Sequence, residues 1–192
     1  MKNRQATYSE TFIAAKRLVS SFLVLMLTYT QAVANSAELN WLRSAVGIST
    51  KRNVVVLTKD GTSLFADIYH PIGTKKTPTI LVRIPYTRTL EKKLMTDLSA
   101  HMWAGRGYTV VIQTTRGKGL SGGTFYPMQY EREDGLDTLS WLPKQKWFNG
   151  QVMTWGGSAF GQTQWSISDS KNPKLSAFFM YESSSHFHDM FY

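Results

Sequence analysis

Short apolar runs of strand length alternate along this chain with amphipathic stretches of helical spacing. The runs at residues 53–58 and 63–69 flank Lys59-Asp60-Gly61-Thr62, and an Asp-Gly pair between two such runs indicates a hairpin turn. Residues 79–84, 108–113, 151–155 and 175–181 have the length and the apolar or β-branched content of further strands. Helical spacing at residues 94–104, 130–142 and from 159 to about 168 places a helix after most of these strands.

This alternation predicts an α/β fold. Strands joined through helices form right-handed crossovers and a mainly parallel sheet in a three-layer sandwich, with the first hairpin as its antiparallel edge. In sheets of this kind, reactive groups gather at the carboxyl ends of the strands. Three features of this chain follow predicted strands directly: Tyr86, the glycine-rich loop from Arg116 to Gly123, and Ser158.

The first 34 residues have the pattern of a signal peptide. A basic stretch precedes an apolar run of about ten residues, Leu18 to Leu27, and Ala32-Val33-Ala34 satisfies the small-x-small rule for cleavage. We therefore expect cleavage after Ala34, export to the periplasm or the medium, and a mature chain of residues 35–192. The apolar run is too short to span ~30 Å of hydrocarbon, so we expect no stable membrane anchor.

The composition of the chain excludes several classes of function. The formal net charge is +9, but four of the 22 basic side chains and one of the 13 acidic ones lie in the predicted leader, so the remainder carries about +6. These charges are scattered and form no basic stripe of the kind that follows phosphates, so we expect no nucleic-acid partner. Without cysteine the fold cannot depend on disulfides. No metal-ligand spacing and no phosphate- or dinucleotide-binding loop occurs, so we expect neither a metal nor a cofactor.

Ser158 is the candidate nucleophile. It stands in Gly156-Gly157-Ser158-Ala159-Phe160-Gly161, between a predicted strand and a predicted helix, which is the setting of a nucleophile elbow. Such a turn strains the serine backbone and needs small neighbours, and it aims the first amides of the helix, beginning with Ala159, at a developing oxyanion. The strict Gly-x-Ser-x-Gly spacing is not met, because the second glycine comes one residue late, at Gly161.

Several separated segments resemble the cocaine esterase and X-Pro dipeptidyl-peptidase family of serine hydrolases, between Val82 and Trp165. They are VRIPY at 82–86, RGKGLSGGTFYP at 116–127, EDGLDTLSWL at 133–142, KWFNG at 146–150, and GGSAFG at 156–161 with TQW at 163–165. The resemblance implies an α/β-hydrolase fold in which Ser158 attacks an ester or amide carbonyl. It also implies that Tyr86 donates a hydrogen bond to the oxyanion.

Two positions depart from the family pattern. Thr115 stands where the family often has an aspartate, and Ala159 stands where it often has a tyrosine. Ala159 keeps the backbone amide that the oxyanion needs, and Thr115 changes the bracing of the loop. We interpret Arg116 and Asp134 as structural charges rather than reactants.

The general base and its acid are not evident in this sequence. An α/β-hydrolase triad runs in the order serine, acid, histidine, and only His186 and His188 follow Ser158. An improvised triad with Asp189 is disfavoured, and His70 and His101 fit a strand end and a helix. In the resembled family the triad aspartate and histidine come more than a hundred residues later, after a helical cap and before a β-sandwich. We therefore expect residues 35–192 to be the N-terminal part of a truncated hydrolase domain.

Two hypotheses follow. The first is an exported serine hydrolase of small esters, amides or short peptides that is inactive as this fragment. The second is a catalytically silent, truncated domain that binds a ligand or is vestigial. Ester versus peptide preference, the substrate and the oligomeric state stay open at this point.

Overall fold

The computed structural model describes residues 47–87, 89–171 and 175–185, without the side chain at position 91. The predicted signal peptide at residues 1–34 lies outside these ranges, as do His186, His188 and Asp189. No helix of the described ranges has the length and apolarity required to cross a bilayer.

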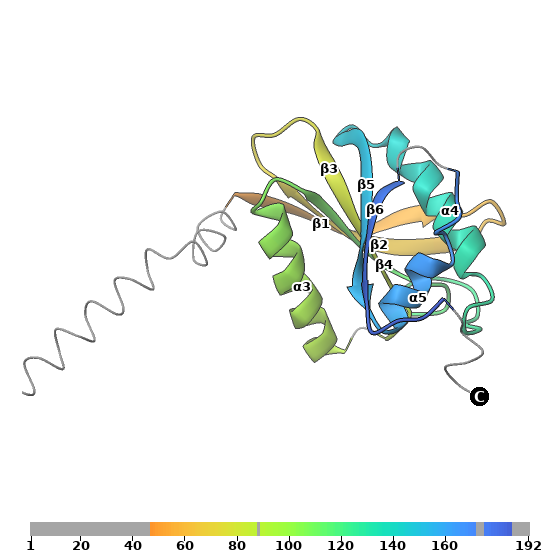
Figure 1. Cartoon of the computed structure of the whole chain (residues 1–192). Coiled ribbons are helices and arrows are strands. Elements are labelled where there is room, and N and C mark those ends of the chain that lie inside the picture. Colours follow the sequence, from red (N-terminus) through yellow and green to blue (C-terminus); the bar gives the residue numbers. More distant parts are fainter. Residues whose placement is uncertain (1–46, 88, 172–174, 186–192) are drawn as a thin grey trace, which may run out of the picture. The chain divides into compact units, whose positions relative to one another are not determined.

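One six-stranded sheet organises the described part of the chain (Figure 1). Its strands lie in the order β1-β2-β4-β3-β5-β6; β1, β2 and β4 pair antiparallel, whereas β4, β3, β5 and β6 pair parallel. The elements in chain order are β1 (Ile48–Leu57), β2 (Ser63–Pro71), β3 (Thr77–Ile84), α3 (Leu90–Ala104), β4 (Thr109–Thr114), α4 (Glu131–Trp141), the 3-10 helix η1 (Leu142–Lys144), β5 (Phe148–Gly157), α5 (Ala159–Trp165) and β6 (Leu175–Tyr181). The predicted hairpin, the mainly parallel sheet and the antiparallel edge are confirmed.

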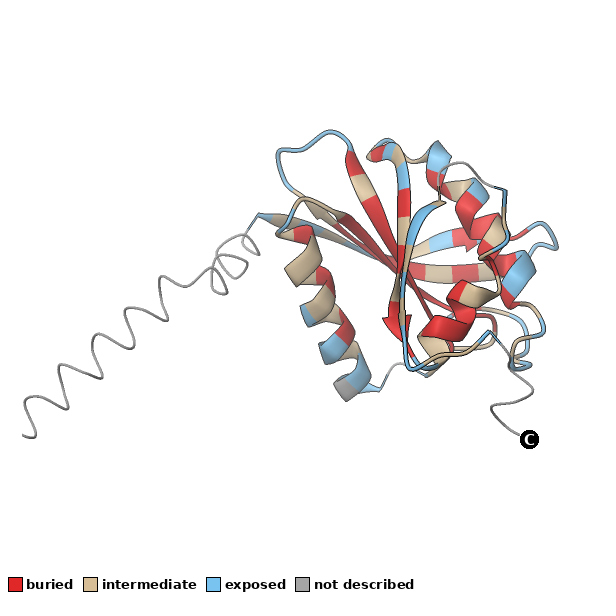
Figure 2. Ribbon diagram, viewed as in Figure 1, coloured by how far each residue is buried: buried red, intermediate tan, exposed pale blue. Residues whose placement is uncertain are grey.

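Helices cover both faces of the sheet, which makes the predicted three layers. Helix α3 lies on one face, and α4 and α5 lie on the other (Figure 1). The α3 side buries one apolar cluster that includes Ile80, Val82 and Ala100, and the other side buries a second that includes Leu81, Leu139 and Ile167. The alternation of Ile80, Leu81 and Val82 between the two clusters is the two-residue period of a strand that is covered on both sides. Figure 2 shows the resulting burial along the central strands.

A buried ion pair fixes the start of α4 against the centre of the sheet. Arg83 on β3 is 3% exposed, and its Nη2 lies 2.9 Å from the carboxylate of Glu131. The same guanidinium donates to the Glu131 carbonyl oxygen at 2.6 Å and to Gln113 Oε1 at 3.1 Å. Burial raises the pKa of Glu131, and the Arg83 charge opposes that rise. A Cβ at Gly135 would lie 2.9 Å from Arg83 Nη1, so only glycine leaves room for the guanidinium.

A second polar cluster ties α3 to the first hairpin. The carboxylate of Asp97 accepts hydrogen bonds from Arg52 at 3.1 and 3.2 Å, from Lys93 at 2.5 Å, and from the hydroxyl of the fully buried Tyr69. Partial burial pushes the pKa of Asp97 up, but the hydrogen bonds from Arg52, Lys93 and Tyr69 prevail and lower it to about 2. Burial raises the pKa of Tyr69, and the bond to Asp97 adds to that rise.

Stability should therefore depend on the ionisation of Asp97. The carboxyl titrates near 3.9 in an unfolded chain and near 2 here, so its contribution is present above about pH 4 and is lost as pH falls toward 2. We expect Asp97→Asn to lower the free energy of unfolding at pH 7 by about 1–2 kcal/mol after solvent screening, and by much less at pH 2. Urea unfolding at both pH values measures this.

Glu133→Gln is the matched control, because it removes one carboxylate from the exposed side of α4. Its effect should be small and similar at both pH values. An Asp97→Asn deficit that stays constant from pH 7 to pH 2 would contradict the prediction.

Candidate active site

The carboxyl ends of three neighbouring parallel strands carry the three features that the sequence singled out. Tyr86 follows β3, the loop that begins at Thr115 and Arg116 follows β4, and Ser158 follows β5 directly. Because β3, β4 and β5 run parallel, these features lie at one edge of the sheet. This edge is the candidate active site.

Ser158 has the backbone of a tight strand-to-helix turn. Its φ is 53° and its ψ is −128°, a conformation that non-glycine residues rarely adopt. Its N–H donates to the Tyr181 carbonyl oxygen at 3.0 Å, and its carbonyl oxygen accepts from Gly161 at 2.9 Å and from Gln162 at 3.2 Å. The residue is exposed, and its hydroxyl does not cap the helix that it precedes. The hydroxyl is therefore available for chemistry.

Steric crowding requires glycine at the two positions before Ser158. A Cβ on Gly157 would lie 2.2 Å from the ring of Tyr181 on β6. Gly156 has a φ of 142°, and a Cβ there would lie 2.4 Å from the Cβ of Phe160. At these positions β5 therefore lies too close to β6 and to α5 for any larger residue, and the small neighbours that the sequence analysis expected are required.

Gln164 braces this turn from inside the fold, a role that the sequence alone did not reveal. Its buried side-chain amide donates to the carbonyl oxygen of Gly156 at 2.9 Å, and its Oε1 accepts from the hydroxyl of Thr154 at 2.7 Å. The neighbouring hydroxyl of Thr163 donates to the carbonyl oxygen of Arg83 at 3.2 Å. These bonds join the last turn of α5 to the ends of β5 and β3. In the sequence, the only sign of this role is that Thr163 and Gln164 are polar residues on the side of a short predicted helix that faces the sheet.

Tyr86 lies against the first turn of α5. Its half-buried ring packs on the ring of Phe160, with 5.7 Å between centroids and 55° between planes. The ammonium of Lys92 stands 4.1 Å from the same ring centre on the α3 side. Since Phe160 comes two residues after Ser158, the phenol and the serine turn share one corner of the sheet edge. Ala159 is the first residue of α5, so its N–H has no acceptor within the helix.

Both histidines in the described ranges form hydrogen bonds within the fold. His70, at the end of β2, uses Nδ1 with the Thr109 hydroxyl at 2.7 Å and Nε2 with the Thr74 carbonyl oxygen at 3.1 Å. His101, on α3, uses Nδ1 with the Asp97 carbonyl oxygen at 2.7 Å, and its ring meets the ring of Tyr69 edge-on. Their places on a strand end and a helix are as predicted.

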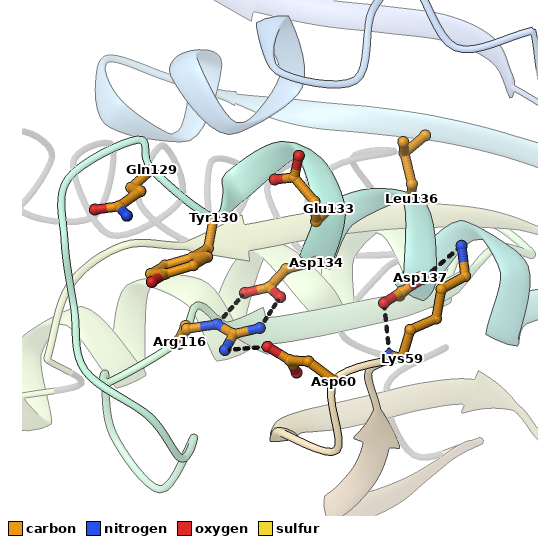
Figure 3. Close-up of a pocket in the computed structure, with 9 residues that line it drawn as sticks. All are labelled: Lys59, Asp60, Arg116, Gln129, Tyr130, Glu133, Asp134, Leu136 and Asp137. Carbon is orange, nitrogen blue, oxygen red and sulfur yellow. Dashed lines mark hydrogen bonds and ion pairs between the residues drawn. The ribbon is translucent and has the colours of Figure 1, made fainter.

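A polar cavity of about 460 Å³ lies beside the turn of the first hairpin and the start of α4 (Figure 3). At its base Arg116 donates to both oxygens of Asp134, at 2.6 and 3.1 Å, and to Asp60 at 2.7 Å. The ring of Tyr130 covers the guanidinium at 4.5 Å. The hydrogen bonds from Arg116 hold the pKa of the Asp60 carboxyl well below its ordinary value, and Asp134 raises the pKa of Arg116.

The residues that line this cavity join the turn of the first hairpin to the start of α4. Arg116 pairs with Asp60 and Asp134, and Lys59 pairs with Asp137. The lining includes neither Ser158 nor Tyr86. The interpretation of Arg116 and Asp134 as structural charges agrees with these contacts. Among the residues that the structure describes, no group of three or more histidine, aspartate and glutamate side chains could hold a metal ion.

Comparison with known proteins identifies the family of the chain. Residues 60–192 match the family described as X-Pro dipeptidyl-peptidase (S15 family). The chain is 40% identical over 118 residues to the cocaine esterase of Rhodococcus sp. (strain MB1 Bresler), a match that covers 61% of this chain and 21% of that protein.

Solved structures of hydrolases are also similar to this chain. A CocE/NonD family hydrolase from Staphylococcus aureus is similar with a TM-score of 0.60 and 25% identity, over 68% of this chain and 27% of that one. An aminopeptidase from a marine sediment archaeon, Thaumarchaeota archaeon, is similar with a TM-score of 0.58 and 27% identity, over 69% of this chain and 25% of that one. The matched region thus spans between a fifth and somewhat over a quarter of the length of these relatives.

Proposed function

Because the chain belongs to the X-Pro dipeptidyl-peptidase (S15) family, we propose that it provides the nucleophile and the oxyanion donors of a serine hydrolase of ester or amide bonds. The fold is that of the α/β-hydrolases. The observation that carries the proposal is Ser158: an exposed hydroxyl on a strained turn between β5 and α5, free of any capping bond.

The proposed reaction begins with attack by the Ser158 oxygen on the substrate carbonyl carbon. The hydroxyl proton passes to a general base, and the carbonyl oxygen becomes an oxyanion that accepts hydrogen bonds from the Tyr86 phenol and the Ala159 N–H. The bond from carbonyl carbon to the leaving oxygen or nitrogen then breaks, and the leaving group takes the proton. Water hydrolyses the resulting acyl-enzyme by the reverse sequence of proton transfers.

The general base and its acid are proposed to come from outside residues 47–185. No histidine follows Ser158 within the described ranges. His70 and His101 use ring nitrogens in hydrogen bonds that hold the fold together. We propose that a later part of a longer polypeptide supplies both groups and that the 192 residues alone are inactive. Small esters, amides or short peptides are the proposed substrates.

The same observation favours a second candidate function for these residues by themselves. A chain with the nucleophile turn but no base would bind a ligand in the ground state without turning it over. A catalytically silent, truncated binding domain or a vestigial protein is therefore the alternative.

A fluorophosphonate probe separates the two candidates, because it bonds only to an activated serine. We expect the intact protein expressed from its gene to carry the adduct on the peptide that contains Ser158, and to hydrolyse p-nitrophenyl acetate. An adduct on a different serine would refute the assignment of the nucleophile. A folded protein that neither reacts nor hydrolyses would support the silent alternative.

Export is proposed from residues 1–34, whose basic start, apolar run and Ala32-Val33-Ala34 fit a signal peptide. The mature protein should then begin at Asn35 and be found in the periplasm or the medium. N-terminal sequencing of the protein recovered from cell fractions measures this; a cytoplasmic protein that retains Met1 would refute it.

A further inference from the structure

A lysine ammonium lies over the ring of Tyr86, the proposed oxyanion donor. Lys92 lies in the first turn of α3, six residues after Tyr86, and its Nζ is 4.1 Å from the centre of the Tyr86 ring. In the described ranges no acidic side chain forms an ion pair with it. Among the described side chains, the contact recorded for its ammonium is with the face of an aromatic ring.

The neighbouring lysine shows what a structural lysine looks like in the same turn. Lys93 donates to the carboxylate of Asp97 at 2.5 Å and takes part in the cluster that ties α3 to the first hairpin. Two adjacent residues of the same type thus have opposite surroundings. Lys93 pairs with a carboxylate, whereas the exposed Lys92 lies over the ring of Tyr86.

The backbone holds Lys92 in this place. Thr89 caps α3, and its hydroxyl oxygen accepts from the N–H of Lys92 at 3.4 Å. The N-terminus of α3 therefore lies beside Tyr86, and the partial positive charge of the helix end adds to that of the ammonium. The surroundings of the proposed oxyanion donor therefore carry positive charge from the Lys92 ammonium and from the helix end. The side chain of Glu91, in the same turn, lies outside the described residues.

We propose that Lys92 is a specificity-determining residue that favours substrates bearing a carboxylate close to the reacting carbonyl. The inference rests on the proposed function of Ser158 and Tyr86. An ammonium beside the phenol attracts such a carboxylate in the bound substrate, because the two groups carry opposite charges. A neutral ester of the same shape gains nothing from this contact.

Matched substrates test the proposal in the intact protein. Mono-p-nitrophenyl adipate carries a carboxylate in its acyl chain, and methyl p-nitrophenyl adipate has the same chain with that charge removed. We expect Lys92→Met to lower the ratio of their kcat/KM values, charged over neutral, by about tenfold, and Lys92→Arg to restore most of it. Lys93→Met is the matched control, since it removes the same charge one residue away and should leave the ratio unchanged.

The ratio separates substrate selection from a general effect on catalysis. If Lys92 acted only on the oxyanion, both substrates would slow equally and the proposal would be wrong. An equal fall of the ratio in Lys93→Met would also overturn it, because the effect would then come from net charge.

A binding measurement makes the result independent of turnover. In the Ser158→Ala background, calorimetry with adipic acid monoanilide and its methyl ester should show the same tenfold change of the Kd ratio on Lys92→Met. If wild-type protein hydrolyses neither ester, the proposed function fails, and these dissociation constants still decide whether Lys92 recognises the carboxylate. An unchanged Kd ratio would overturn the inference.

Discussion

Ser158→Ala should lower kcat/KM for p-nitrophenyl acetate by about 10⁴- to 10⁶-fold in the intact protein. The change removes the atom that is proposed to form the acyl bond, which would close the acyl-enzyme path. What remains is catalysis by the oxyanion donors and by substrate positioning. Initial rates and a single-turnover burst measure the loss, and the fluorophosphonate adduct should disappear at the same time.

The expected loss is chemical and not structural. The Ser158 hydroxyl does not cap α5, and the backbone bonds of the turn use only its N–H and carbonyl oxygen, which alanine keeps. Thermal unfolding should therefore change little. Ser140→Ala, on the exposed side of α4, is the matched control and should keep full activity. If Ser158→Ala retained a tenth of the wild-type rate, the nucleophile would lie elsewhere.

The elements of this fold were predictable because their signals are local. Asp60-Gly61 marks the first hairpin, where Gly61 has a φ of 85°, and the period of the apolar residues distinguishes the strands from the helices. Some boundaries were less accurate. Helix α3 starts at Leu90 and not near residue 94, because its first turn is held by the Thr89 cap rather than by apolar contacts.

Contacts between distant residues were not predictable. Arg83 stands in an apolar run that indicates a buried strand, and its burial makes sense only with Glu131, 48 residues later in the chain. Gln164 is similar: its amide matters because the carbonyl of Gly156 and the hydroxyl of Thr154 both face it. Buried polar groups are satisfied by partners that only the folded chain assembles, so the sequence pattern shows the residue and not its role.

In the candidate site, too, local patterns could be predicted and contacts between distant residues could not. The turn at Ser158 was predictable because a glycine-rich stretch between a strand and a helix is a local pattern. Tyr86 was assigned by resemblance alone, since a tyrosine after a proline has no local signal of its own. Its place against Phe160, beside the serine turn, depends on the parallel pairing of β3 with β5.

Tyr86→Phe should lower kcat by about 10²- to 10³-fold and leave KM nearly unchanged. The phenol is proposed to donate to the oxyanion, which exists only in the transition state and the tetrahedral intermediate, and the loss of one such donor costs about 2.7–4 kcal/mol. Phenylalanine keeps the ring that packs on Phe160 and lies under the Lys92 ammonium, so the wall of the site should stay in place. Steady-state kinetics with p-nitrophenyl acetate measure both parameters.

The split between kcat and KM decides what the phenol does. A rise of KM at constant kcat would mean that Tyr86 binds the substrate in its ground state, and the oxyanion role would be wrong. Tyr126→Phe is the matched control, because Tyr126 is exposed in the loop before α4 and should contribute to neither parameter. A loss confined to kcat in Tyr86→Phe, with thermal unfolding unchanged, would leave the missing hydroxyl as its only cause, because the two side chains differ in nothing else.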